Sequence, residues 1–127
     1  KYFLEKKSDT SIGIIEWEES KKNQIAGIKG KIVNSLWNED KGILILTTLE
    51  KKKNTKSFIY GIDLEKHNII FEDEILGITN TRFYGNYLLY DYIVKDRKII
   101  KIFDVKKLNE YDEIKIKGDC GIKNIKL

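Results

Sequence analysis

The chain has 127 residues and a formal net charge of +4, and it contains no proline or methionine. This length suits one domain or part of one, and 41% hydrophobic residues is enough to build a core. No apolar run reaches the roughly 18 residues of a membrane helix, and the lone cysteine, Cys120, excludes an internal disulfide. The absent initiating methionine indicates a processed or truncated chain and favours an envelope or surface location over others.

Most lysines lie next to acidic residues, a pattern typical of a mixed, solvated surface. The exception is the basic run EKKKNTKS at 50–57, in which Asn54 and Thr55 predict a hairpin turn. We expect a solvated hairpin tip here, with phosphate contact as the alternative. The lysines concerned are Lys51, Lys52, Lys53 and Lys56.

Short runs of β-branched and aromatic residues recur without a long helical stripe, so the sequence predicts an all-β fold. The run Ile43 to Leu46 is apolar on both faces, which indicates a strand between two layers. In chain order, the main expected strands cover residues 11–19, 42–50, 56–64, 68–75, 86–94, 98–105 and 110–116.

Three phrases return in register along the chain, roughly every 44 residues. One phrase ends in an acid, at Glu16, Asp63 and Asp104. A second contains Ile-x-Asn, at Ile32/Asn34, Ile78/Asn80 and Ile122/Asn124. A third opens a strand, at Phe3, Ile43 and Tyr87. Repeats of this length with four short strands each are the signature of β-propeller blades.

The predicted fold is therefore all-β, with antiparallel four-stranded blades of a β-propeller and about three blades' worth of strands. A β-sandwich or a small barrel is the alternative. Residues 1–127 are expected to form a single repeat domain that is a segment of a larger propeller. The expected repeats cover residues 1–31 (partial), 32–77, 78–121 and, as the start of the next repeat, 122–127.

The phrases IFDVKK and YGIDLEK resemble the third strand of WD40-like and quinoprotein-like propeller repeats, where an apolar strand ends in an acid before a hairpin. The resemblance covers nearly the whole chain and implies the general propeller class. The Gly-His pair and Trp-Asp dipeptide of WD40 repeats are missing, as are the sialidase Asp-box and the kelch double glycine. No specific family is implied.

Packing between blades explains why a phrase must recur, since each blade has to offer its neighbour the same apolar stripe. Core positions are expected at Trp17, Ile62, Leu64, Phe103 and Val105. The acids that close the phrase are expected to accept backbone N–H bonds in turns rather than to catalyse.

Asn34, Asn80 and Asn124 fall on expected inner strands, which border the central channel of a propeller. The simplest interpretation is that each side chain bonds nearby backbone. The alternative is that the three line the channel and converge on a small ligand.

Aromatic residues close the expected inner strands, and most of them should pack between blades. The loops SLWNEDKG and NTRFYGNY occupy equivalent positions in two repeats and should emerge on one rim. Tryptophan, tyrosine and arginine at a rim are typical of a protein-binding hot spot. The rim candidates are Trp37, Arg82, Phe83 and Tyr84.

The sequence shows no catalytic set. The single histidine, His67, lies in an expected hairpin and is predicted to be exposed, and with Cys120 it cannot make a metal site. The neighbouring acids Asp73 and Glu74 point to opposite faces of a strand. We expect no metal and no cofactor.

These features favour a non-enzymatic protein-binding or scaffolding module. The alternative is a ligand-sensing or enzymatic propeller whose channel site is completed by residues outside this chain. The expected partners are a protein and the remaining blades, supplied by the same chain or by a second copy. Nucleic acid is the least favoured partner.

Overall fold

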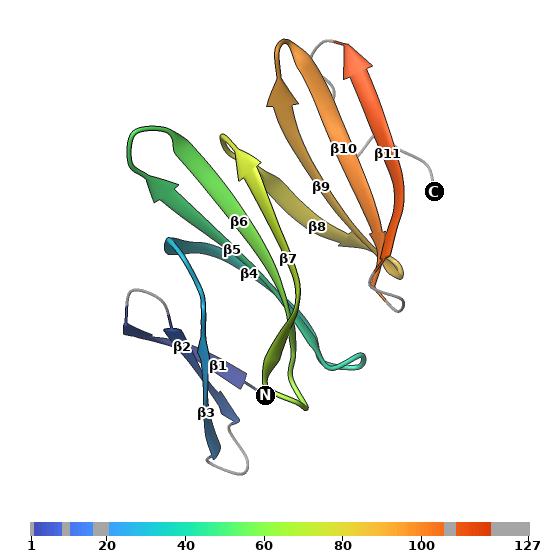
Figure 1. Cartoon of the computed structure of the whole chain (residues 1–127). Coiled ribbons are helices and arrows are strands. Elements are labelled where there is room, and N and C mark those ends of the chain that lie inside the picture. The colour runs from blue at the N-terminus through green and yellow to red at the C-terminus, as the bar shows by residue number, and fades with distance from the viewer. Residues whose placement is uncertain (1, 9–10, 17–20, 106–108, 118–127) are drawn as a thin grey trace. The chain divides into compact units, whose positions relative to one another are not determined.

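The computed structural model describes residues 2–8, 11–16, 21–105 and 109–117. These residues form eleven strands in three antiparallel sheets, with no helix among them (Figure 1). The chain divides into two compact units, residues 1–74 and 75–127. The all-β prediction is confirmed.

The first sheet has three strands in the order β1-β2-β3. They are β1 (Tyr2–Ser8), β2 (Ser11–Glu16) and β3 (Lys21–Ala26). The register places Tyr2 opposite Glu16, just as Ile43 lies opposite Asp63 in the second sheet. Tyr2 therefore marks the start of the repeating strand, and the predicted position, Phe3, is wrong by one residue. Such a slip matters because it turns every side chain to the other face of the strand.

The second sheet has the strand order β4-β5-β6-β7. Its strands are β4 (Lys31–Asn38), β5 (Ile43–Lys51), β6 (Thr55–Asp63) and β7 (Asn68–Leu76). Long β-branched and aromatic runs place β5 and β6 at the centre of this sheet. Leu44 and Ile45 point to opposite faces of β5 and are both buried, as predicted for a strand between layers.

The third sheet has the order β11-β10-β9-β8. Its strands are β8 (Asn80–Tyr84), β9 (Tyr87–Val94), β10 (Arg97–Asp104) and β11 (Asn109–Lys117). Lys95 and Asp96 form the two-residue loop between β9 and β10, with φ of 48° and 66°. Two positive φ values in such a loop are typical of a type I′ hairpin turn, whose twist matches that of the strands.

Both four-stranded sheets are antiparallel meanders in chain order, the arrangement of propeller blades. The same backbone hydrogen bond between two loops also occurs in both sheets. The Leu64 N–H donates to the Gly42 carbonyl at 2.8 Å, and the Val105 N–H donates to the Asn86 carbonyl at 3.0 Å. These sheets are the predicted blades, and the first sheet supplies three strands of another.

The core of the first unit joins the first two sheets. Ile12 and Ile14 of β2 pack in one buried cluster with Leu44 of β5 and with Tyr60 and Ile62 of β6. Burying each such side chain contributes roughly 1.5–3 kcal/mol. The predicted core positions Ile62 and Leu64 are confirmed in this cluster, whereas Trp17 lies outside the described residues.

The second unit uses both faces of its sheet. Leu89, Ile100 and Ile102 form a buried cluster on one face. On the other face, the rings of Tyr90 and Phe103 stack with centroids 5.6 Å apart. The predicted core residue Val105 is buried, and Phe103 is half-buried.

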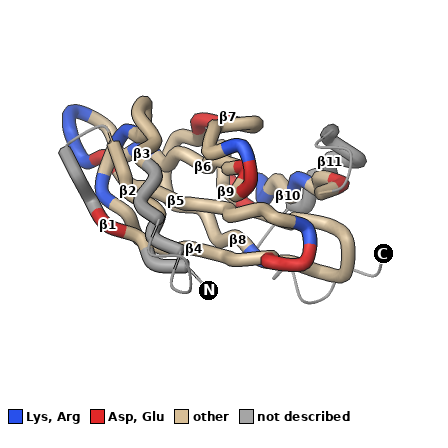
Figure 2. The backbone as a smooth tube through the Cα atoms, turned by 90° about the horizontal axis from the view of Figure 1, so that it is seen from below, with Lys and Arg blue, Asp and Glu red and all other residues tan. Residues whose placement is uncertain are grey.

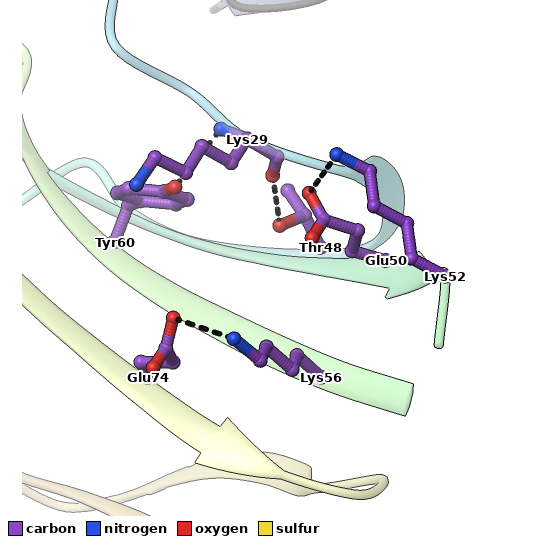
Figure 3. Close-up of polar contacts among 7 residues, drawn as sticks. All are labelled: Lys29, Thr48, Glu50, Lys52, Lys56, Tyr60 and Glu74. Carbon is purple, nitrogen blue, oxygen red and sulfur yellow. Dashed lines mark hydrogen bonds and ion pairs between the residues drawn. The ribbon is translucent and has the colours of Figure 1, made fainter. Parts of the chain in front are cut away.

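The loop between the first two sheets is held by side chains of the second. The Lys29 N–H donates to the Tyr60 hydroxyl at 2.9 Å, and the Thr48 hydroxyl donates to the Lys29 carbonyl (Figure 3). Gly30 follows with φ of 83°, and a Cβ there would lie 3.0 Å from the Leu49 carbonyl oxygen. The loop therefore requires glycine at this position.

Candidate functional site

Three side chains on β8 share one exposed face. Burial alternates along this strand, so that Asn80, Arg82 and Tyr84 are exposed while Thr81 and Phe83 are half-buried. Because successive side chains of a strand point to opposite faces, the exposed three lie in a row, and we call them the β8 face. Tyr84 is 49% exposed. The row combines an amide, a guanidinium and a phenol.

Residues of the paired strand β9 lie beside the β8 face on the same side of the sheet. Arg82 lies opposite Leu89, and Asn80 lies opposite Asp91. The Asp91 carboxylate forms an ion pair with Lys98 at 3.5 Å, and its carbonyl accepts a hydrogen bond from the Thr79 hydroxyl at 2.7 Å. The acid next to the row is therefore already paired with a lysine of its own sheet, and Arg82 is the exposed charge of the β8 face.

The four predicted rim residues do not lie together on one face. Phe83 points to the face opposite Arg82 and Tyr84, because neighbouring strand residues alternate. Trp37 belongs to the other unit, where it lies opposite Leu44 and packs, half-buried, against the core of that unit. Only Arg82 and Tyr84 share an exposed face.

The predicted channel asparagines also differ in their surroundings. Asn34 on β4 is exposed beside a β-bulge that shifts the register between Ile32 and Asn34. The bulge leaves Val33 exposed as well, at 54%. Asn80 is exposed within the β8 face. Asn124 lies outside the described residues.

The predicted basic hairpin tip joins β5 to β6. Lys51, Lys52 and Lys53 are exposed, and Asn54 lies in the turn. Lys52 lies 3.9 Å from a Glu50 carboxylate oxygen, and Lys56 lies 3.8 Å from one of Glu74 (Figure 3). The exposure of these lysines agrees with the expected solvated hairpin tip.

Asp63 builds a turn, as predicted for the acid that closes the phrase. Its Oδ1 accepts the N–H groups of Glu65 at 2.8 Å and Lys66 at 2.9 Å. The same turn ends at His67, which has φ of 59° and is half-buried rather than exposed as expected. Its N–H donates to the Asp63 carbonyl at 2.8 Å, and this hydrogen bond closes the turn. The Glu16 side chain is not described.

Neither a metal cluster nor a membrane-spanning helix is found in the part of the chain that the structure describes. No group of three or more His, Cys, Asp or Glu side chains there could hold a metal ion. The same described residues contain no helix that is long and apolar enough to cross a membrane.

Sequence reasoning missed the buried ion pair between Asp91 and Lys98. A usable signal was present, because Asp91 interrupts the largely apolar run YLLYDYIV. An acid in such a run requires a partner. Within the described residues, no buried side-chain nitrogen or oxygen lacks a hydrogen-bond partner.

No protein-family model and no curated protein matches the sequence. Solved structures do resemble the fold. AztD of Citrobacter koseri superposes with a TM-score of 0.64 at 14% identity, over 93% of this chain and 33% of its own. Acylaminoacyl peptidase of Pyrococcus horikoshii gives 0.64 at 13% identity, over 91% of this chain and 22% of its own.

The dihydro-heme d1 dehydrogenase NirN, solved in complex with DHE, gives a TM-score of 0.65 at 19% identity, over 94% of this chain and 26% of its own. The chain has a β-propeller-type fold. It spans a third or less of the length of these propeller-like structures. At such identities the likeness concerns the fold alone.

Proposed function

We propose that this chain is a non-enzymatic protein-binding or scaffolding module, and that the β8 face contacts a protein partner. The observation that carries the proposal is the exposed row of Asn80, Arg82 and Tyr84 on one strand. Tyrosine and arginine dominate binding hot spots because each combines a large contact area with directional hydrogen bonds.

Strand pairing holds the backbone that carries this row. β8 pairs with β9 along its whole length, and the two strands join through a two-residue loop that begins at Gly85, with φ of 59°. Side chains on such a hairpin lose little backbone entropy when a partner binds. β8 is also an edge strand, and extended segments of partner proteins commonly add to sheet edges.

Propeller rings contain at least about four blades. The described residues supply two four-stranded sheets and one three-stranded sheet. We therefore propose that further blades complete the ring, from the same chain or from a second copy. The WD40-like or quinoprotein-like character of the blades belongs to this proposal as well, supported by the apolar strands that end in Asp63 and Asp104.

The test compares Arg82→Ala and Tyr84→Ala with Arg97→Ala. Arg97 is an exposed arginine on β10 and does not belong to the β8 face, so it serves as a matched control. Partner capture from a cell extract should fall for the first two variants and persist for the control, with unchanged circular dichroism in all three. Equal capture by all variants, or unfolding of both β8 variants, contradicts the proposal.

A second candidate is a ligand-sensing or enzymatic propeller with a channel site completed by residues outside this chain. It is supported by the exposure of Asn34 and Asn80 on the first strands of their sheets, and by a structural neighbour that was solved with a bound compound. Asn80→Ala should then abolish ligand binding without unfolding the chain. Unfolding of that variant would instead assign Asn80 a structural role.

A further inference from the structure

Lysines gather at one end of the β4–β7 sheet, around the β5–β6 hairpin. We call this set the basic end; its members are Lys29, Lys31, Lys51, Lys52, Lys53 and Lys56. The strand register brings them together, because Lys31 lies opposite Leu49, two residues before Lys51. Lys31 and Lys51 are thus diagonal neighbours on one face, about 7 Å apart.

Three of the six lysines of the basic end already contact another side chain. Lys52 and Lys56 pair with Glu50 and Glu74 at 3.9 and 3.8 Å (Figure 3). The Lys29 Nζ lies 5.8 Å from the centre of the Phe58 ring. Both ion pairs are long and partly exposed, so they contribute little to stability, and their carboxylates offset two of the six positive charges.

The other half makes no ion pair within the described part of the chain. Lys31, Lys51 and Lys53 are exposed, and none of them forms an ion pair with another described residue. Six lysines with two paired carboxylates give this end of the sheet a positive potential.

The opposite end of the same sheet is acidic. Its two turns carry Glu39, Asp40, Asp63 and Glu65, against Lys41 and Lys66. Figure 2 shows the charged residues gathered largely at the turns, with acidic and basic residues adjacent in the turn after β4. These two turns therefore carry a small net negative charge, in contrast to the net positive charge of the hairpin at 50–57.

Basic residues recur at the same hairpin of the other repeats. The hairpin between the second and third strands of the next blade carries Lys95 and Arg97 on either side of Asp96, and the corresponding phrase of the first repeat contains Lys6 and Lys7. A charge pattern that returns at equivalent positions of successive repeats is an observation independent of the contacts within one sheet.

We propose that the basic end of the β4–β7 sheet binds an acidic, extended segment of a partner protein. Side chains on one face of an extended chain repeat about every 7 Å, which matches the separation of Lys31 and Lys51. This surface is distinct from the β8 face, and the proposal does not depend on it.

Nucleic acid and membrane fit this surface less well. Single-stranded nucleic acid is held more tightly where exposed aromatic rings add stacking, but Phe58 and Tyr60 are buried. A membrane surface is held more tightly where apolar side chains insert beside the charges, and the segment 50–57 contains none. An acidic peptide needs only the ammonium groups that the basic end offers.

The test measures binding of a fluorescent peptide of alternating Glu and Ser to the whole chain, by anisotropy at low and at physiological salt. Lys51→Glu/Lys53→Glu should weaken binding about tenfold. The matched control, Lys41→Glu/Lys66→Glu, makes the same change in net charge at the acidic end and should alter binding less than about twofold. Both double variants must retain the native circular dichroism spectrum.

Equal weakening by the two double variants would overturn the proposal, because it would show a response to net charge alone. Absence of peptide binding at low salt would also overturn it. Duplex DNA, a single-stranded oligonucleotide and vesicles containing phosphatidylserine are measured in parallel. If any of these binds more tightly than the peptide and loses affinity with Lys51→Glu/Lys53→Glu, the assignment to an acidic protein segment is wrong.

Discussion

The ion pair between Asp91 and Lys98 is expected to be the most sensitive polar contact of the second unit. The two side chains are 7% and 13% exposed, and they reach across from β9 to β10. Asp91→Asn removes the negative charge that lies 3.5 Å from the largely buried ammonium group. Lys98→Met keeps most of the side-chain volume but leaves the carboxylate unpaired. Breaking a buried pair from one side costs roughly 3–5 kcal/mol.

We expect each single variant to lower the free energy of unfolding by about 3 kcal/mol, near the lower end of that range, because Lys98 retains some water contact. The double variant should lose about 2 kcal/mol less than the sum of the two single losses, since either single change already removes the attraction between the two charges. Urea denaturation followed by circular dichroism gives these values by linear extrapolation.

The exposed pair of Lys52 and Glu50 provides the control cycle. Lys52→Met, Glu50→Gln and their combination should each change the free energy of unfolding by less than about 1 kcal/mol. If the Asp91 and Lys98 variants are instead additive within about 0.5 kcal/mol, the two charges do not stabilise one another, and the reasoning fails.

Tyr60→Phe should cost about 1 kcal/mol at neutral pH by removing the bond from the Lys29 N–H. Burial raises the pKa of Tyr60 in the folded chain. The stability linked to this hydroxyl is therefore complete below about pH 10 and is lost as the pH rises through the folded pKa. Denaturation of both proteins at pH 8 to 11 should show that the free energy of unfolding falls less with rising pH for the variant. Gly61→Ala should cost about 1–3 kcal/mol, because the new Cβ would lie 3.1 Å from the Phe71 Cβ, and a smaller side chain at 71 should relieve the loss in a double variant. Asp63→Ala should lower the melting temperature by removing two turn hydrogen bonds, whereas an unchanged melting temperature would contradict the structural role of this acid.

Much of the fold was predictable because it depends on short-range pattern. The apolar run Ile43 to Leu46 predicted a strand buried on both faces, and β5 has that character. The recurring phrase predicted equivalent strands, and β6 and β10 end at Asp63 and Asp104. Alternation and turn residues are local properties, so they can be recognised before any tertiary contact is known.

The candidate site was less predictable, for two different reasons. Simple alternation along β8 already separates Phe83 from Arg82 and Tyr84, so the sequence contained that information. The bulge after Ile32, which exposes both Val33 and Asn34, has no comparable local signal, because it arises where β4 must match β5.

The sequence by itself determined the all-β class, the central strands and the turn closed by Asp63, since each follows from residues close together in the chain. Only the tertiary structure decided that Tyr2 rather than Phe3 faces Glu16, that Lys98 neutralises Asp91, and that Lys31 joins Lys51 at the basic end. All three depend on which residue of a neighbouring strand lies opposite. That register is set by the packing of whole faces, and a shift of one residue exchanges buried and exposed side chains.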